Sequence, residues 1–120
     1  MKFLQATIQV RDMESSLKFY QEFLGLRLRD RLGGSDREIA FLQGENGETA
    51  IELIHVPQAK KFQGQGISIG FGVDDLSAFY KKAQEADLNP GKIIAPNDSI
   101  KFFFIKDPDG VAVQICQITA

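Results

Sequence analysis

Few residues in this chain have side chains suited to acid–base, nucleophilic or metal chemistry. Among its 120 residues there is one histidine, His55, and one cysteine, Cys116. A zinc site built from Cys and His needs about four such ligands, which excludes that class, and a single copy cannot form a disulfide. Any Ser-His-Asp or Cys-His site would have to use His55. Glu52 is the third candidate, because it interrupts the apolar segment AIELIH.

The charge and hydropathy of the chain exclude two classes of partner. Its 14 basic residues are outnumbered by 16 acidic ones, so no basic field for nucleic acid is expected. No apolar run reaches about 18 residues, and the opening MKFLQATIQV is too short and too polar for a signal peptide. With 43% hydrophobic residues, the sequence predicts one soluble, cytoplasmic domain that has its own core and no membrane partner.

An internal repeat sets the positions of these candidates. The segment VRDM at 10–13 returns as VDDL at 73–76, which is 63 residues later. Leu26 matches Leu88 at a spacing of 62, and the turn at 46–47 matches the turn at 109–110 at 63. We therefore expect one domain over residues 1–120, built from module one (about 1–56), a polar connector (about 57–66) and module two (about 67–120).

Each module has the same predicted order of one strand, one helix and three strands. Apolar and polar residues alternate in FLQATIQV, which is typical of a strand with one buried face. Asp12 is expected to cap a helix that ends at Gly25, and a second helix is expected from Asp75 to about Asp87. The predicted strands are 3–10, 27–32, 37–43 and 48–55 in module one, and 67–73, 92–95, 101–106 and 111–117 in module two.

The sheet face that each helix leaves uncovered is where function is expected. That face must be buried by the twin module or line a shared cleft. Because side chains alternate along a strand, Gln5, Thr7, Gln9 and Glu52 are expected on this face. In module two the corresponding positions hold small or uncharged side chains, which are Ser68, Gly70, Gly72, Gln114 and Cys116.

Two interpretations of Glu52 stay open. An ionised carboxylate among apolar neighbours is costly to bury unless it is paired, coordinated or hydrated. Glu52 is therefore either a half-buried group satisfied by water or a cleft carboxylate that acts as a base or a ligand. His55 lies three residues further on, so alternation predicts it on the opposite face, and Cys116 is expected to fill apolar space.

Three further segments have expected side-chain positions. Alternation would place Arg27, Arg29 and Arg31 on one strand face, where they meet either an anionic ligand or solvent. The run at 102–104 should send two phenylalanine rings to one face and one ring to the other. The turn DPDG at 107–110 is expected to need a positive φ at Gly110.

The chain resembles the glyoxalase/bleomycin-resistance/dioxygenase superfamily, also called the vicinal oxygen chelate proteins. The resemblance rests on VRDMESSLKFYQEFLGL near the start, AIELIHV at the close of module one and FFFIKDPDGVAVQICQ near the end. It implies an α+β fold of two βαβββ repeats, whose mixed sheets form an open half-barrel cleft. It also implies a homodimer that handles a small molecule.

The resemblance further implies four metal-ligand positions, one on each equivalent strand position. They fall on Gln5 and Glu52, which match the pattern, on Ser68 where His is expected, and on Gln114 where Glu is expected. Divalent cations favour anionic oxygen or imidazole ligands, so two such losses should weaken binding greatly. A divalent metal (Ni, Zn, Fe or Mn) held through Gln5 and Glu52 stays possible, but no tightly bound cofactor is expected.

The leading expectation is a protein that binds or sequesters a small ligand without a tight metal. The alternative is a glyoxalase I-like lyase, of the lactoylglutathione lyase type, with Glu52 as its catalytic base and a weakly bound divalent metal. A third interpretation is a metal-free isomerase that uses Glu52 as base. The expected ligand-binding residues are Gln5, Thr7, Ser68, Gly70, Phe102, Phe104 and Gln114.

Overall fold

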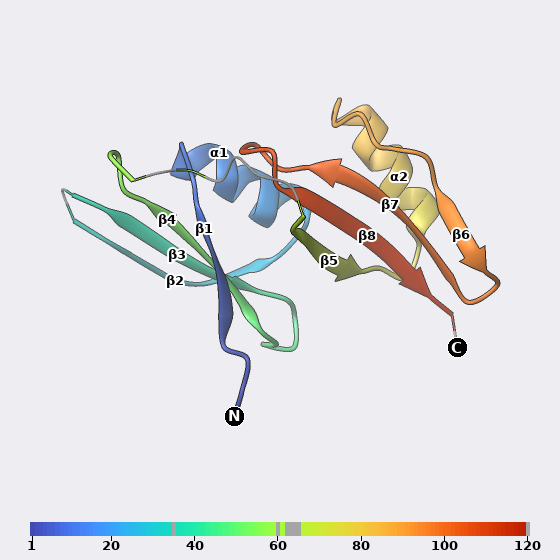
Figure 1. The fold of residues 1–120 in the computed structure, drawn as a ribbon, viewed down its shortest axis with the longest axis horizontal. Helices are drawn as coiled ribbons and strands as arrows, with labels where there is room; N and C mark the ends of the chain where they lie inside the picture. The colour runs from blue at the N-terminus through green and yellow to red at the C-terminus, as the bar shows by residue number, and fades with distance from the viewer. Residues whose placement is uncertain (35, 60, 62–65, 120) are drawn as a thin grey trace. The chain divides into compact units, whose positions relative to one another are not determined.

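The computed structural model describes residues 1–34, 36–59, 61 and 66–119. The chain divides into two compact units, unit one from Met1 to Gln63 and unit two from Gly64 to Ala120 (Figure 1). Much of the predicted connector, about 57–66, lies outside the described residues.

The two units repeat one order of elements, as the sequence predicted. In unit one these are β1 (Gln5–Gln9), α1 (Met13–Leu17), a π-helical segment η1 (Lys18–Phe23), β2 (Arg27–Gly33), β3 (Glu38–Gln43) and β4 (Ala50–His55). In unit two they are β5 (Ser68–Gly72), α2 (Leu76–Glu85), β6 (Ile94–Asn97), β7 (Ile100–Lys106) and β8 (Ala112–Ile118).

Each unit contains a four-stranded mixed sheet. The strand orders are β1-β4-β3-β2 and β5-β8-β7-β6, and neither sheet closes on itself. The first strand of each unit runs parallel to the last, and the other pairs are antiparallel. The parallel pairs share one register, because Thr7 lies opposite Glu52 and Gly70 lies opposite Gln114. The predicted fold class of two βαβββ repeats with mixed sheets is confirmed.

One helix packs on one face of each sheet. α1 lies against β4, and α2 lies against β7 and β8 (Figure 1). The strand residues on that face are buried, among them Ile8, Leu42 and Leu53 in unit one and Phe103 and Ile115 in unit two. Burial of these large apolar side chains supplies the main stabilising free energy of each unit.

Two expected core positions are exposed. Leu4 and Ile67 precede the first strand of their units, and their exposed fractions are 71% and 60%. The alternation of FLQATIQV predicted a strand from residue 3, but regular pairing starts at Gln5. Leu4 therefore lies beyond the part of the sheet that the helix covers.

The first predicted helix consists of an α-helical part followed by a π-helical part. α1 is followed by η1, in which the Leu24 N–H donates to the Phe19 carbonyl, five residues back, at 3.0 Å. Phe19 and Tyr20 are adjacent in sequence and are both buried, with their rings edge to face at 5.0 Å. Gly25, with a φ of +77°, ends the helix where the sequence predicted.

The second helix follows its prediction closely. The Asp75 carboxylate caps α2 by accepting from the Ala78 N–H at 3.1 Å. The helix ends at Glu85, two residues before the predicted end, and Asp87 has a φ of +57°. Among the described residues, no helix is both long and apolar enough to cross a membrane.

The turn between β7 and β8 is organised by a buried carboxylate. Asp107 is only 5% exposed, and its Oδ1 accepts from the N–H groups of Asp109 and Val111, both at 2.8 Å. Gly110 has a φ of +86°, as the DPDG pattern predicted. Asp107 thus satisfies two backbone donors that the strand ladder does not pair.

We predict that Asp107→Ala lowers the free energy of unfolding by about 1–3 kcal/mol, because two backbone donors lose their acceptor. Asp107→Asn should cost less, since its amide oxygen still accepts. Urea unfolding followed by circular dichroism measures both. Asp98→Ala, at an exposed position between β6 and β7, is the control and should change stability by less than about 0.5 kcal/mol. Equal midpoints for Asp107→Ala and the unsubstituted protein would contradict this role.

Candidate functional site

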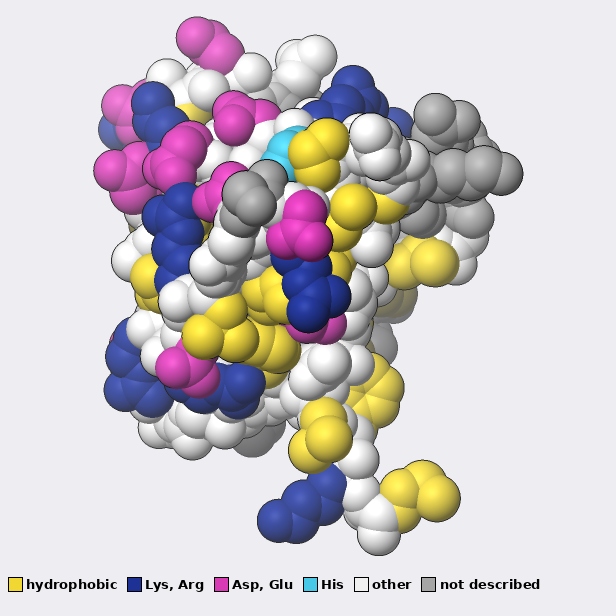
Figure 2. Space-filling view, turned by 90° about the vertical axis from the view of Figure 1, so that its left-hand side faces the viewer, with side chains coloured by type: hydrophobic (Ala, Val, Ile, Leu, Met, Phe, Trp, Pro, Cys, Tyr) yellow, Lys and Arg dark blue, Asp and Glu magenta, His cyan; other side chains and the backbone are white. Residues whose placement is uncertain are grey.

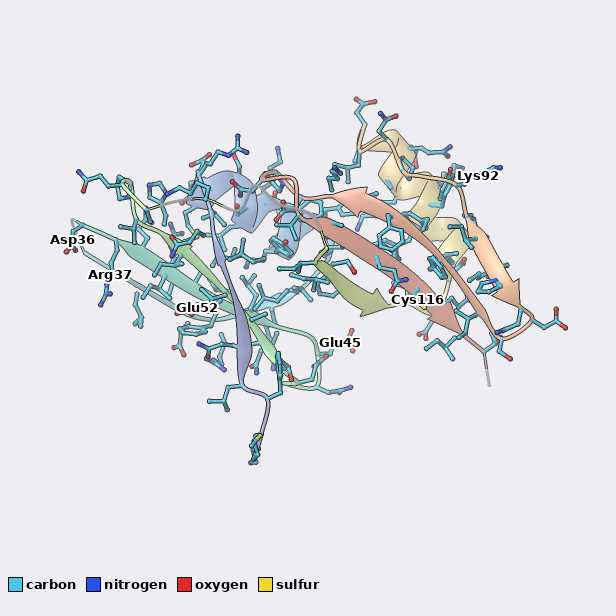
Figure 3. The ribbon with its side chains drawn as sticks, in the orientation of Figure 1. Asp36, Arg37, Glu45, Glu52, Lys92 and Cys116 are labelled. Carbon is cyan, nitrogen blue, oxygen red and sulfur yellow. The ribbon has the colours of Figure 1, made fainter. Side chains whose placement is uncertain are left out.

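The face of the unit-one sheet opposite α1 carries the candidate carboxylate. Glu52 is half-buried on β4 (Figure 3). Its Oε1 accepts from Thr7 Oγ1 at 2.5 Å and from Gln5 Nε2 at 3.2 Å. Both donors come from β1, whose parallel register sets Thr7 directly beside Glu52. The structure therefore brings together three predicted site residues of unit one, and protein side chains satisfy one oxygen of the carboxylate.

The corresponding face of unit two has different chemistry. Gln114 occupies the position of Glu52, and its amide lies over Gly70. A Cβ atom on Gly70 would lie 3.3 Å from Gln114 Oε1. The space that this glycine leaves is thus partly taken by Gln114. Ser68 lies on the same strand, opposite Ala112, and no interaction with Gln114 is seen in the described part of the chain.

Aromatic side chains continue the unit-two face. Phe104 lies opposite Gln114 and is 37% exposed, whereas Phe103 is fully buried on the helix side. The rings of Phe102 and Phe104 meet edge to face at 5.8 Å. The predicted division of the three rings is confirmed. Cys116, opposite Phe102 on β8, is half-buried on this face (Figure 3).

The two faces have the same arrangement of paired positions but carry different residue types. The row Thr7, Glu52 and Phe41 in unit one corresponds to the row Gly70, Gln114 and Phe104 in unit two. Unit one therefore presents a hydrogen-bonded carboxylate, and unit two presents an amide and exposed aromatic surface. Sequence reasoning missed Phe41, although the spacing of 63 from Phe104 is the same signal that revealed the repeat.

The donor set of the four family positions does not suit a tightly held divalent metal. It comprises one carboxylate, two amides and one hydroxyl, from Glu52, Gln5, Gln114 and Ser68. Gln5 and Thr7 direct hydrogen-bond donors at one oxygen, Oε1, of the single carboxylate in this set, Glu52. In the described residues no three His, Cys, Asp or Glu side chains cluster as metal ligands would.

His55 lies away from Glu52, as alternation predicted. It pairs with Glu38 on the helix side of the sheet, and its Nδ1 is 2.9 Å from the Val10 carbonyl oxygen. Asp12 lies near this end of the strands. The pKa of Asp12 is lowered, first by the 2.6 Å hydrogen bond from the Ser15 hydroxyl and then by hydrogen bonds from the backbone N–H groups of Ser15 and Glu14. His55 thus joins the ends of β1 and β4 rather than serving the Glu52 face.

The three alternating arginines do not share a face. The register of β2 shifts between Leu28 and Asp30, so Arg29 occupies a bulge. Arg29 lies over the Phe41 ring at 4.7 Å and pairs with Asp30 at 3.4 Å. Arg31 instead binds two carboxylates on the helix side. The expectation of one arginine face is wrong, because a single bulged residue reverses the alternation beyond it.

Arg31 is held by Glu14 of α1 at 2.6 Å and Glu38 of β3 at 3.0 Å. These hydrogen bonds, that of Glu14 first, raise the pKa of Arg31. Basic and acidic side chains are also mixed on the face of the molecule that Figure 2 shows. Such mixing provides no single-sign field of the kind that nucleic acids bind.

Known proteins are similar to this chain in sequence or in fold. The chain is 35% identical over 116 residues to the uncharacterized protein YwbC of Bacillus subtilis, covering 92% of each chain. It is 31% identical over 126 residues to a lactoylglutathione lyase of Haemophilus influenzae, covering 98% of this chain and 93% of the relative. TnmS3, an antibiotic binding protein from Streptomyces sp. CB03234, has the same fold, with a TM-score of 0.80 at 19% identity over 99% and 97% of the two chains.

A family model agrees with these similarities. The model of the Glyoxalase/Bleomycin resistance protein/Dioxygenase superfamily matches residues 2–115. That span includes all of β1 to β7, the first four residues of β8, and the proposed site residues from Gln5 to Gln114. The chain belongs to the glyoxalase/bleomycin resistance protein/dioxygenase superfamily.

Proposed function

We propose that this protein binds a small organic molecule on the open faces of its sheets and holds no tight divalent metal. The observation that carries the proposal is the state of Glu52, whose Oε1 is bound by Thr7 and Gln5 of its own sheet. Its counterpart in unit two, Gln114, is uncharged. A tight metal centre needs several anionic or imidazole ligands, whereas ligand binding needs apolar surface with a few placed polar groups.

The proposed binding residues provide both kinds of surface. Gln5, Thr7 and Glu52 supply hydrogen-bonding groups in unit one. Phe102 and Phe104 supply partly accessible aromatic surface in unit two. Ser68, Gly70 and Gln114 complete the unit-two set with a hydroxyl, bare backbone and an amide. Within each unit, an aromatic or mixed polar and apolar ligand suits the groups of that unit's own face. The fold is compatible with this use, since TnmS3 is an antibiotic binding protein.

The second candidate function is a lyase of the lactoylglutathione type, favoured by the similarity to the Haemophilus influenzae enzyme. In this function Glu52 would remove a proton from the thiol hemiacetal of an α-ketoaldehyde, and a divalent metal would stabilise the resulting anion when bound. Gln114 stands where the resemblance places a second carboxylate, and an amide does not accept that proton. This substitution favours the ligand-binding function.

We predict that protein purified without chelator carries far less than one divalent ion per chain, because one carboxylate is the only charged donor of the four positions. Inductively coupled plasma mass spectrometry measures the nickel, zinc, iron and manganese content. Stoichiometric metal in protein from cells grown with these ions would show the proposal to be wrong.

We further predict no turnover of the hemithioacetal of methylglyoxal and glutathione, with or without added Ni²⁺, Zn²⁺, Fe²⁺ or Mn²⁺. Formation of the thioester product is followed by absorbance. The lyase function instead requires turnover that rises with metal and is lost in Glu52→Gln but kept in Glu45→Gln, which changes an exposed carboxylate in the turn after β3. That pattern would establish the second candidate.

The double variant Ser68→His with Gln114→Glu restores both residue types of the family pattern. We predict that this variant binds Ni²⁺ or Zn²⁺ more tightly than the unsubstituted protein, because it adds an imidazole and a carboxylate as ligands. The gain should exceed roughly 10–100-fold, which is the effect of a single residue that only supports a metal ligand. Isothermal titration calorimetry compares it with the unsubstituted protein. Gln114→Asn with Ser68→Ala is the matched control and should gain nothing. Unchanged affinity in the first variant would refute the idea that these two losses removed the metal.

The resemblance also predicts a homodimer, which stays a prediction. Light scattering of the purified protein gives its mass in solution. A mass near twice the 13.4 kDa of one chain is the expected result.

A further inference from the structure

Glu52 carries a negative charge that the described part of the chain does not pair with a cation. Its two donors, Thr7 and Gln5, are neutral, and both use Oε1. Oε2 accepts no hydrogen bond from any described residue. Because Glu52 is half-buried, its carboxylate has lost part of its hydration, so a positively charged partner would be strongly favoured there.

A second uncommitted acceptor lies on the same face. Gln9 follows Thr7 by two residues on β1, so both side chains point to the side of Glu52. Gln9 Oε1 is buried and receives no hydrogen bond within the described residues, although the residue as a whole is only half-buried. Gln9 pairs with Ile54, two residues after Glu52, which puts the Cα atoms of Gln9 and Glu52 roughly 8 Å apart. Two long side chains at this separation can reach one group once the buried Gln9 amide turns toward Glu52.

The arginines on this face do not neutralise the negative charge of Glu52. Arg29 lies over Phe41 and is compensated by Asp30 at 3.4 Å. Arg27 lies opposite Gln43 on the same face, but β3 separates its strand from that of Glu52, and it is exposed to screening solvent. Next to Glu52, the apolar surface comes from Phe41 and from Ile39 and Ile54, which pair across the sheet.

We infer that the ligand of this protein carries a protonated nitrogen with at least two N–H groups, which presupposes the ligand-binding function proposed above. One N–H donates to Glu52 Oε2, and another donates to Gln9 Oε1 after the Gln9 amide turns out of its buried position. The apolar part of the ligand lies on Ile39, Ile54 and the edge of Phe41. Gln5 and Thr7 hold the carboxylate in position from the other side. The ligand class is therefore an organic amine or guanidine with an adjoining apolar group, rather than an organic anion.

The test compares three monosubstituted benzenes of similar size and different charge, namely benzylamine, benzyl alcohol and benzoate. Binding to ¹⁵N-labelled protein at pH 7 is followed by amide chemical shifts in β1 and β4. We expect benzylamine to bind about five- to tenfold more tightly than benzyl alcohol, and benzoate to bind most weakly. Glu52→Gln should remove the preference for the amine, and Gln9→Leu should reduce it. Glu45→Gln, which loses the same charge in an exposed turn, should keep it.

The outcomes separate this inference from the function on which it rests. The spectrum of each variant first shows that it is folded. If the alcohol and the acid shift the β1 and β4 amides as strongly as the amine does, ligand binding is supported and the amine preference is wrong. A preference that survives in Glu52→Gln also overturns the inference. If no probe shifts these amides at any accessible concentration, both the inference and a ligand-binding role for this face fail.

Discussion

The pairing of Thr7 with Glu52 across two parallel strands is the constraint on which the candidate site depends. A carboxylate on an otherwise apolar strand is stable only where neighbouring groups replace the water that it loses. β1 supplies these groups, and it does so only in the observed register, because a shift by one residue would turn Gln5 and Thr7 to the helix side. The polar chemistry and the register of this strand pair are therefore selected together.

The two units show how one backbone plan carries two chemistries. Glu52 and Gln114 occupy the same place in the same register, yet Thr7 donates to the first and Gly70 only makes room for the second. A glycine in a strand costs stability and packing. A Cβ atom at position 70 would lie 3.3 Å from Gln114 Oε1, so the Gln114 amide would have to shift slightly. The residue types of Thr7 and Gly70 therefore suit the residues opposite them, Glu52 and Gln114, and the two repeats differ accordingly.

Sequence patterns were sufficient for the fold and for much of one face. The repeat at 63 predicted the order of elements, and alternation alone placed Gln5, Thr7 and Glu52 together on one side of the sheet. The failures occurred where one residue changes the local period. Arg29 forms a bulge that the alternation of residue types does not reveal. The segment η1 is π-helical, although the spacing of its apolar residues is that of an ordinary α-helix. The sequence also did not reveal that the side-chain oxygen of Gln9 has no hydrogen-bond partner among the described residues, because hydrogen bonding depends on atomic positions that no residue pattern specifies.

The parallel pairing of β1 with β4 also has a kinetic consequence. Thr7 and Glu52 are 45 residues apart, so their hydrogen bond closes one of the longest loops in unit one. The hairpin contacts of β2, β3 and β4 span far fewer residues, and contacts of short span form at lower entropic cost. β1 is therefore expected to dock on a preformed three-stranded sheet late in folding. The Glu52 face would then acquire its donors in the last steps, which keeps incompletely folded chains from presenting a finished site.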